Sequence, residues 1–235
     1  MRRPGLIVLA VTLLVGSVAA FTYTQKLKLE RSPVSTAHFD RWLSPECDCP
    51  RRTATLRFQL RERERIDATM VDGNGDFVKT LLVGSEQGPG QVATEWDGRN
   101  EAGMVVPDGD YRVRVRMRDE RRTIVIPVEV HVDTVPPQAR LLGVSSTTLA
   151  PGEEVELRYR TNEFGRPFLL VDDELADRKA ARKPGRNTVV WAGRVGDSMV
   201  SAGIYSVSLV VQDRAGNRSD PTSAADIAVT AGAGR

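Results

Sequence analysis

Few side chains in this 235-residue sequence have the chemistry of a catalytic or metal-binding site. The two cysteines, Cys47 and Cys49, lie in the stretch SPECDCP, and the two histidines, His38 and His131, lie far from each other in the sequence. A structural zinc site uses four such ligands, which two cysteines alone do not supply. In an exported protein, the cysteines predict a small disulfide that rigidifies the start of the first domain. We therefore expect a disulfide at this pair and no metal ion or cofactor.

The sequence also lacks the arrangements that catalysis requires. Nucleophilic catalysis pairs a serine or cysteine with a positioned base, and neither histidine lies near a Gly-x-Ser-x-Gly turn. No glycine-rich phosphate loop precedes a helical pattern. The stretch DGNGD, residues 72–76, spaces its polar residues as a calcium loop does, but Val83 stands at the twelfth position, where such a loop has an acid. Gly73 and Gly75 favour a turn instead, and we expect no catalytic residues.

The clearest charged pattern is a set of four alternating arginines: Arg112, Arg114, Arg116 and Arg118. In a strand they would lie on one face, where they could form a basic stripe for anionic cell-wall polymers or lipid head groups. The competing interpretation is a solvated face whose arginines pair with acids across the sheet, for example with Glu129 or with Glu62 and Glu64. The second interpretation is favoured because acids elsewhere cancel the basic charge in number.

The overall charge balance gives no general attraction to polyanions. The sequence contains 33 basic and 31 acidic residues, a formal net charge of +2. Arg2 and Arg3 are the charged residues among the first 25, so the remainder carries 31 basic and 31 acidic residues. A balanced remainder is not typical of a nucleic-acid-binding protein. We expect no nucleic-acid partner.

The N-terminal segment indicates where the protein resides. Residues 4–25 have no charged side chain and are long enough to span a bilayer as a helix. The alternative is a cleaved signal peptide, with a small-residue site ending at Ala20 just before Phe21. Apolar character continues beyond that site, which favours an uncleaved anchor over residues 1–25. We expect a single pass through the cytoplasmic membrane, with the C-terminal part extracytoplasmic; the alternative is a secreted protein.

The rest of the chain has the periodicity of β-strands. Residues 26–50 mix charge, proline and isolated apolar groups without a clean period, which predicts a juxtamembrane linker. From Thr53 onward, apolar and polar residues alternate, and this pattern predicts half-buried strands separated by glycine, asparagine and aspartate turns. Pro127 interrupts the alternating stretch 123–132, which predicts an edge strand or a bulge.

The plan repeats after the stretch VDTVPP, residues 132–137, whose prolines stiffen the backbone and predict a domain boundary. WDGRNEAGMVVPDGDYRVRV, residues 96–115, aligns with WAGRVGDSMVSAGIYSVSLV, residues 191–210. The shared residues, in order, are Trp96 and Trp191, Gly98 and Gly193, Arg99 and Arg194, Met104 and Met199, Gly109 and Gly203, and Tyr111 and Tyr205. This correspondence predicts two tandem homologous domains, residues 51–133 and 134–230. Recurrence at one repeat position also favours core packing of both tryptophans over sugar binding.

The stretch WDGRNEAGMVVPDGDYRVRV, residues 96–115, resembles the terminal hairpin of the immunoglobulin-like domain found in the flagellar hook-capping protein and in many bacterial surface proteins. Residues 53–132 resemble that domain well, and residues 140–217 resemble it weakly, with Ala192 where the first copy has Asp97. QDRAGN, residues 212–217, and VDTVPP are similar to bacterial immunoglobulin-like tandem repeats. The resemblance implies an all-β fold, two tandem immunoglobulin-like β-sandwiches, used as a spacer, scaffold or adhesion module.

We therefore expect a noncatalytic, membrane-anchored cell-envelope protein that presents two immunoglobulin-like modules after an N-terminal transmembrane helix. Its expected partners are the membrane, through that helix, and envelope proteins or anionic wall polymers. The alternatives are a secreted adhesin and an accessory protein that binds a cell-wall polymer through the alternating arginines or an exposed edge strand. An enzyme whose sandwiches support a distant site is the least favoured.

Overall fold

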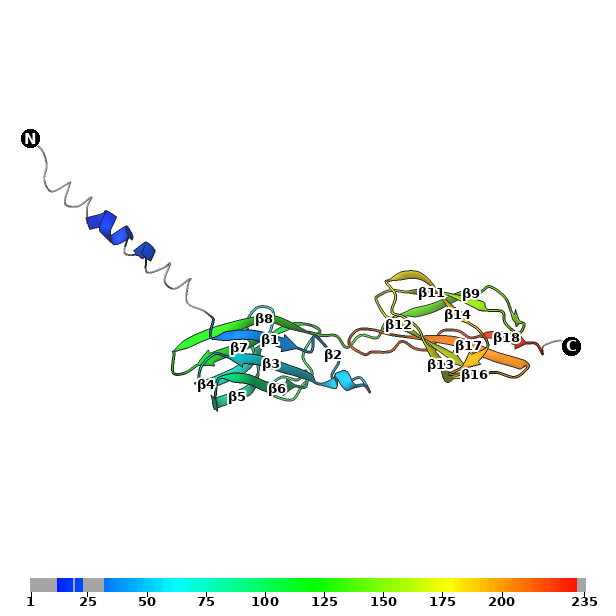
Figure 1. The fold of residues 1–235 in the computed structure, drawn as a ribbon, viewed down its shortest axis with the longest axis horizontal. Coiled ribbons are helices and arrows are strands. Elements are labelled where there is room, and N and C mark those ends of the chain that lie inside the picture. Colours follow the sequence, from blue (N-terminus) through cyan, green and yellow to red (C-terminus); the bar gives the residue numbers. More distant parts are fainter. Residues whose placement is uncertain (1–11, 19, 23–31, 232–235) are drawn as a thin grey trace, which may run out of the picture.

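The computed structural model describes residues 12–18, 20–22 and 32–231, which are mostly β-strand (Figure 1). Two β-sandwiches lie end to end and are joined by a short connection, so the predicted all-β fold is confirmed. Residues 12–18 and 20–22 are helical. Within the three described ranges, no helix combines the length and the apolar character needed to cross a bilayer. Of the 22 residues of the predicted span over residues 4–25, 12 lie outside the described residues.

The first sandwich consists of two sheets. The larger sheet has the order β2 (Trp42–Leu43), β8 (Arg122–Val132), β7 (Gly109–Met117), β4 (Glu64–Val71) and β5 (Phe77–Gln87). The smaller sheet has the order β1 (Val34–Phe39), β3 (Ala54–Leu60) and β6 (Gly90–Trp96). The strands pair in antiparallel fashion except β2, which pairs with β8 in parallel.

The second sandwich repeats this strand order. Its larger sheet has the order β10 (Thr148–Leu149), β18 (Ala225–Val229), β17 (Gly203–Gln212), β12 (Arg166–Val171) and β13 (Glu174–Arg178). Its smaller sheet has the order β9 (Ala139–Val144), β11 (Val155–Thr161) and β14 (Gly185–Trp191), and a two-stranded ribbon joins β15 (Arg194–Val195) to β16 (Ser198–Met199). β10 pairs with β18 in parallel, as β2 does with β8. The internal repeat is therefore a repeat of topology as well as of sequence.

The expected linker over residues 26–50 is wrong for its second half. Residues 34–39 form β1, which pairs with β3, and residues 42–43 form β2. The register of β1 shifts between Val34 and Ala37, which breaks the period-two pattern along this strand. β2 is only two residues long. An interrupted strand and a very short one leave no alternation that a sequence pattern can detect.

Alternating side chains build a separate core in each sandwich. In β7, Tyr111 and the apolar residues at every second position after it are buried, while the arginines between them lie on the opposite face. One core cluster runs from Phe39 to Val132 and the other from Leu149 to Ile227. Each fully buried large apolar side chain contributes about 1.5–3 kcal/mol to folding.

The repeat signature serves the same packing role in both copies. Trp96 and Trp191 are almost fully buried, and each packs beside the tyrosine that follows it in the repeat, Tyr111 or Tyr205. Two hydrogen bonds also occur in both copies. The indole N–H of the tryptophan donates to a backbone carbonyl at 2.9 Å, from Trp96 to Arg99 in the first copy and from Trp191 to Arg194 in the second. The tyrosine hydroxyl donates to a backbone carbonyl four residues earlier, from Tyr111 to Pro107 at 2.7 Å and from Tyr205 to Ser201 at 3.0 Å. Both tryptophans are thus core residues.

Two local predictions are also confirmed. The β7–β8 register shifts between Arg112 and Arg114, opposite the segment that contains Pro127, so the proline lies at an irregularity of the ladder. The DGNGD stretch is a turn in which a carboxylate oxygen of Asp72 accepts hydrogen bonds from the backbone N–H groups of Asn74 and Asp76, at 2.9 and 2.8 Å. The Asp72 carboxylate is therefore used by its own loop.

Tyr159 gives the second core a measurable response to alkali. Its side chain is fully buried, and its hydroxyl makes no hydrogen bond within the described part of the chain. Burial raises the pKa of Tyr159 from 10.0 to about 12. Because the folded protein holds the Tyr159 proton more tightly than the unfolded chain does, this group contributes fully to the free energy of unfolding below pH 10. As the pH rises from about 10 to about 12, the protein is expected to lose up to about 2.7 kcal/mol.

Tyr159→Phe tests this expectation. The variant is expected to be as stable as the parent protein, or more stable by about 1 kcal/mol, because it removes an unpaired buried hydroxyl. It should also lose less stability above pH 10. The measurement is urea unfolding at neutral and alkaline pH, and an identical alkaline decline in both proteins would show that Tyr159 does not cause it.

Candidate functional site at the domain junction

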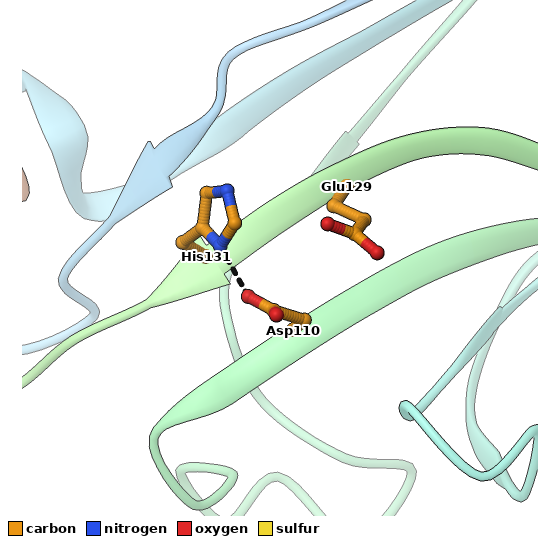
Figure 2. Close-up of side chains that lie close together, drawn as sticks. All are labelled: Asp110, Glu129 and His131. Atoms are coloured by element: carbon orange, nitrogen blue, oxygen red, sulfur yellow. Dashed lines mark hydrogen bonds and ion pairs between the residues drawn. The ribbon is translucent and has the colours of Figure 1, made fainter.

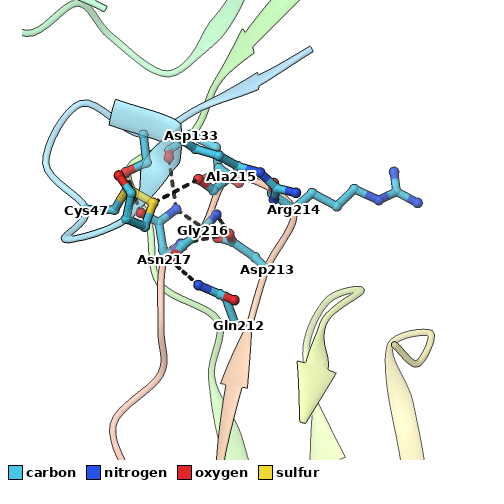
Figure 3. The surroundings of a disulfide bond; sticks show 11 residues. Cys47, Asp133, Gln212, Asp213, Arg214, Ala215, Gly216 and Asn217 are labelled. Atoms are coloured by element: carbon cyan, nitrogen blue, oxygen red, sulfur yellow. Dashed lines mark hydrogen bonds between the residues drawn. A yellow bond between two sulfur atoms is a disulfide. The ribbon is translucent and has the colours of Figure 1, made fainter. Parts of the chain in front are cut away.

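A short disulfide loop of the first sandwich lies against a loop of the second sandwich (Figure 3). Cys47 and Cys49 form a disulfide, and both are partly buried. The loop that carries them is closed by the backbone N–H of Ser44, which donates to the carbonyl of Arg51 at 3.0 Å. A short 3-10 helix over Pro50–Arg52 then leads into β3. The disulfide loop therefore projects from the junction end of the first sandwich.

The facing loop, residues 213–217, is organised by Asp213. One of its carboxylate oxygens accepts hydrogen bonds from the backbone N–H groups of Gly216 and Asn217, at 2.6 and 2.9 Å. Gly216 has a φ of 105°, in the region that favours glycine. A Cβ atom at Gly216 would overlap the Sγ atom of Cys49. The glycine is therefore required both for the turn and for the close approach of the disulfide.

Asn217, in the second sandwich, bonds to the first sandwich and to the connection between the two sandwiches. Its side-chain oxygen accepts a hydrogen bond from the hydroxyl of Ser44 at 2.5 Å. Its side-chain nitrogen donates to the carbonyl of Asp133, in the connection between the sandwiches, at 2.9 Å and to the carboxylate of Asp213 at 2.7 Å. Ser44, Asp213 and Asn217 are all buried. A buried polar group that loses its partner costs about 1–3 kcal/mol, so this network favours one arrangement of the two sandwiches.

Arginines on both sides add further contacts across the junction. The guanidinium of Arg51 donates to the backbone carbonyl of Arg214. The guanidinium of Arg214 lies 4.3 Å from the ring centroid of Phe164 and 5.3 Å from that of Trp42. Phe164 belongs to the second sandwich and Trp42 to the first, so Arg214 contacts an aromatic ring of each. Such cation–π contacts contribute about 0.5–2 kcal/mol.

Three carboxylates come together beside this network. Asp133, Glu163 and Asp213 place one oxygen each within 4.8 Å of the others. Burial raises the pKa of Asp133 and of Glu163, and the negative charge of Asp213 raises both further. An all-oxygen set is the kind that calcium or magnesium binds, although calcium takes six to eight oxygens. Three carboxylates are part of such a shell, and their mutual repulsion opposes the junction at neutral pH.

Replacing Glu163 by glutamine is expected to stabilise the junction at neutral pH. A carboxyl whose folded-state pKa is raised contributes its full stability at low pH, and the contribution is lost as the pH rises through the folded-state pKa. The variant should therefore gain thermal stability at pH 7 relative to the parent protein and little at about pH 3. Thermal unfolding across this range is the measurement, with Glu174→Gln on an exposed part of β13 as the control. Equal shifts in both variants would contradict this explanation.

A second group of metal-ligand residue types lies on the outer face of the first sandwich (Figure 2). Asp110 on β7 is the cross-strand partner of His131 on β8, and the imidazole Nδ1 of His131 contacts the Asp110 carboxylate. Glu129 lies two residues before His131 on the same face. Glu129 accepts two hydrogen bonds from Arg112, at 2.6 and 3.0 Å, and the His131 ring packs against Trp42. The side chains of Glu129 and His131 therefore have contacts within the protein that do not require a metal ion.

The four alternating arginines of β7 and the residue after it differ in their surroundings. The arginine at position 112 pairs with Glu129, as the sequence suggested, and Arg118 pairs with Asp67 at 2.7 Å. The hydrogen bond from Arg118 lowers the pKa of Asp67. Arg114 donates to the carbonyl of Gly75 at 2.6 Å, and Arg116 is exposed. Ion pairs and a backbone contact therefore occupy three of the four guanidinium groups.

The residues that organise the junction were not identifiable as a site from the sequence. Asp213 and Asn217 belong to the stretch QDRAGN, which marks a repeat but does not reveal its partners. Ser44 and Trp42 lie in the segment expected to be a linker. Ser44 and Asn217 are 173 residues apart in sequence, and only the folded chain brings them together.

Comparisons with known proteins give a family match within the first sandwich. Residues 52–120 match the FlgD Ig-like domain. No curated protein matches the sequence. Similar solved structures include the Clostridium thermocellum CbhA fibronectin(III)-like modules, with 14% identity, a TM-score of 0.44, and coverage of 83% of this chain and 94% of that chain. The human OSCAR ligand-binding domain has 14% identity, a TM-score of 0.36, and coverage of 82% and 98%. These structural similarities add nothing to the assignment from residues 52–120.

Proposed function

We propose, from the match of residues 52–120 to the FlgD Ig-like domain, that this chain is a noncatalytic cell-envelope protein with two immunoglobulin-like modules. The strands over residues 34–132 and 139–229 would form the modules, and residues 4–25 would anchor them in the cytoplasmic membrane. Immunoglobulin-like and fibronectin-like folds commonly serve as structural or interaction modules. The modules would act together as a spacer that holds an interaction surface at a set distance from the membrane.

The bonded junction is the observation that carries this proposal. Most domains in one chain move relative to each other unless their interface is extensive. Here Asn217, the disulfide loop and Arg214 all connect the two sandwiches. A spacer requires a defined geometry between its modules, whereas two independently tethered binding modules would not. Disulfides persist in oxidising compartments, which supports placing both modules outside the cytoplasm.

Protease treatment of intact cells tests the location. An anchored protein should stay with the membrane fraction and lose its C-terminal module to protease added outside the cells. The mass of the mature protein separates the alternatives, because a secreted form would begin at Phe21 and would be found in the medium. Full protection of the C-terminal module in intact cells would contradict the proposal.

A further inference from the structure

The outer face of the smaller sheet in the second sandwich carries a row of arginines. In β11, Leu157 and Tyr159 are buried, while Arg158 and Arg160 are exposed on the opposite face. Arg160 is the direct cross-strand partner of both Arg140 on β9 and Arg186 on β14. All three side chains are exposed. Because neighbouring strands are about 4.8 Å apart, three arginine side chains extend from adjacent positions on one face of the sheet, and Arg158 lies two residues from Arg160 on the same face.

Within the described residues, none of these four arginines forms an ion pair. Arg158 donates to the carbonyl of Val144 at 3.3 Å, and the other three make no side-chain hydrogen bond among residues 32–231. Glu156 is the acidic residue of β11 on this face, and its cross-strand partner is the neutral Val190. Among the described residues, no carboxylate therefore lies directly opposite an arginine of the row on a neighbouring strand.

The first sandwich has no comparable row of arginines on neighbouring strands. Its equivalent strand, β3, places Arg57 on the outer face beside Ala93 and His38, with no second arginine in register. On its larger sheet, Arg112 and Arg118 have carboxylate partners. Like charges directly opposite each other on neighbouring strands destabilise a sheet. Three arginines in one row thus reduce the stability of the second sandwich unless an external anion lies against them.

We propose that this row, Arg140, Arg160 and Arg186 with Arg158 beside it, binds a linear anionic polymer that carries phosphate groups. Guanidinium groups hydrogen-bond phosphate oxygens in a planar, two-point geometry. The face is an exposed strand surface, with a shallow groove of about 400 Å³ lined by Leu142, Arg158, Arg186, Asn187 and Thr188. A single small anion would gain little there, whereas a polymer can contact several arginines at once.

The same face is poorly suited to a protein partner. Protein interfaces have an apolar core that is largely free of charge. Here Leu142, 47% exposed, is the large exposed apolar side chain beside the row among the described residues. The charge pattern therefore matches an anionic chain better than a folded protein surface.

The test is polyphosphate binding by the purified full-length chain. The variant R140Q/R160Q/R186Q removes the row, and R57Q/R63Q/R116Q removes three exposed arginines of the first sandwich as a charge-matched control. We expect the row variant to bind polyphosphate at least about tenfold more weakly than the parent protein, and its salt dependence to fall by about two units of log–log slope. The control variant should retain binding and most of the salt dependence.

Several results would overturn the proposal. Unchanged polyphosphate binding by the row variant, or an equal loss in the control variant, would show that the row is not the site. Stronger binding of polyglutamate than of polyphosphate would indicate an acidic polypeptide instead. Binding of vesicles containing phosphatidylglycerol, without binding of soluble polyphosphate, would indicate a lipid surface. The parent chain binding none of these probes would also refute it.

A stability measurement keeps the test independent of the polymer chosen. Arg160→Gln removes the central charge and is expected to raise the melting temperature of the second sandwich at low salt. Arg112→Gln, which breaks an ion pair with Glu129, should lower that of the first sandwich. Added polyphosphate should raise the melting temperature of the parent protein and not that of the row variant. A decrease on Arg160→Gln would contradict the premise that the row is repulsive.

This proposal concerns a ligand and does not depend on where the protein is located. If protease accessibility fails to place the modules outside the cell, polyphosphate binding by the row can still be observed. If the row variant binds normally, the spacer function can still hold. The two results are therefore distinguishable.

Discussion

Trp96→Ala is expected to lower the free energy of unfolding of the first sandwich by about 3–5 kcal/mol. Trp96 is 1% exposed, packs against Tyr111 and donates its indole N–H to the carbonyl of Arg99. The truncation removes a large apolar side chain and leaves a cavity beside the start of β7. Since a domain of this size is stable by only about 5–15 kcal/mol, this loss is a large fraction of the total. Hydrogen exchange of the full chain in denaturant, followed by mass spectrometry, reports each sandwich separately.

The reciprocal variant Trp191→Ala is the matched control. Trp191 occupies the equivalent position, with the same hydrogen bond to the carbonyl of Arg194. Trp96→Ala should reduce protection of amides in β3, β6 and β7, and Trp191→Ala should reduce protection in β11, β14 and β17. Equal loss in both sandwiches for either variant would mean that the two cores unfold as one unit, contrary to their separate packing.

Gly216→Ala is expected to have the second-largest effect, by separating the disulfide loop from the second sandwich. The residue has positive φ, and an added Cβ would overlap the sulfur of Cys49. A non-glycine residue held in this conformation costs about 1–3 kcal/mol, and relief of the overlap requires the loop to move. The buried hydrogen bond between Ser44 and Asn217 should then be lost, and amides of residues 44–52 and 213–217 should exchange faster.

Gly152→Ala separates backbone strain from the junction contact. Gly152 also has positive φ, at 82°, but an added Cβ there meets nothing within 4 Å. This variant should lose about 1–2 kcal/mol while the exchange of residues 44–52 stays unchanged. If Gly216→Ala also leaves the exchange of residues 44–52 unchanged, the position of the disulfide loop does not depend on its contact with Gly216. That result would weaken the proposal that the junction fixes the arrangement of the two sandwiches.

Much of the fold could be predicted because its determinants are local. Alternation of apolar and charged residues from Tyr111 to Met117 indicates which face of β7 is buried, since side chains alternate along any strand. The recurrence of tryptophan, glycine and tyrosine indicates a repeated packing unit, and both copies make the same hydrogen bonds. β1 and β2 could not be predicted, because one has an irregular register and the other is two residues long.

The sequence by itself therefore determined the strand period, the repeated core and the positions of glycine-dependent turns, because each depends on neighbours along the chain. Only the tertiary structure decided which charges are paired and which are not. Arg112 and Arg160 occur in similar alternating stretches, yet Arg112 faces Glu129 whereas Arg160 faces two other arginines. The junction was decided in the same way, because Ser44 and Asn217 are 173 residues apart in sequence and meet only in the tertiary structure. Strand register and domain contacts join distant residues, and their partners cannot be deduced from either segment alone.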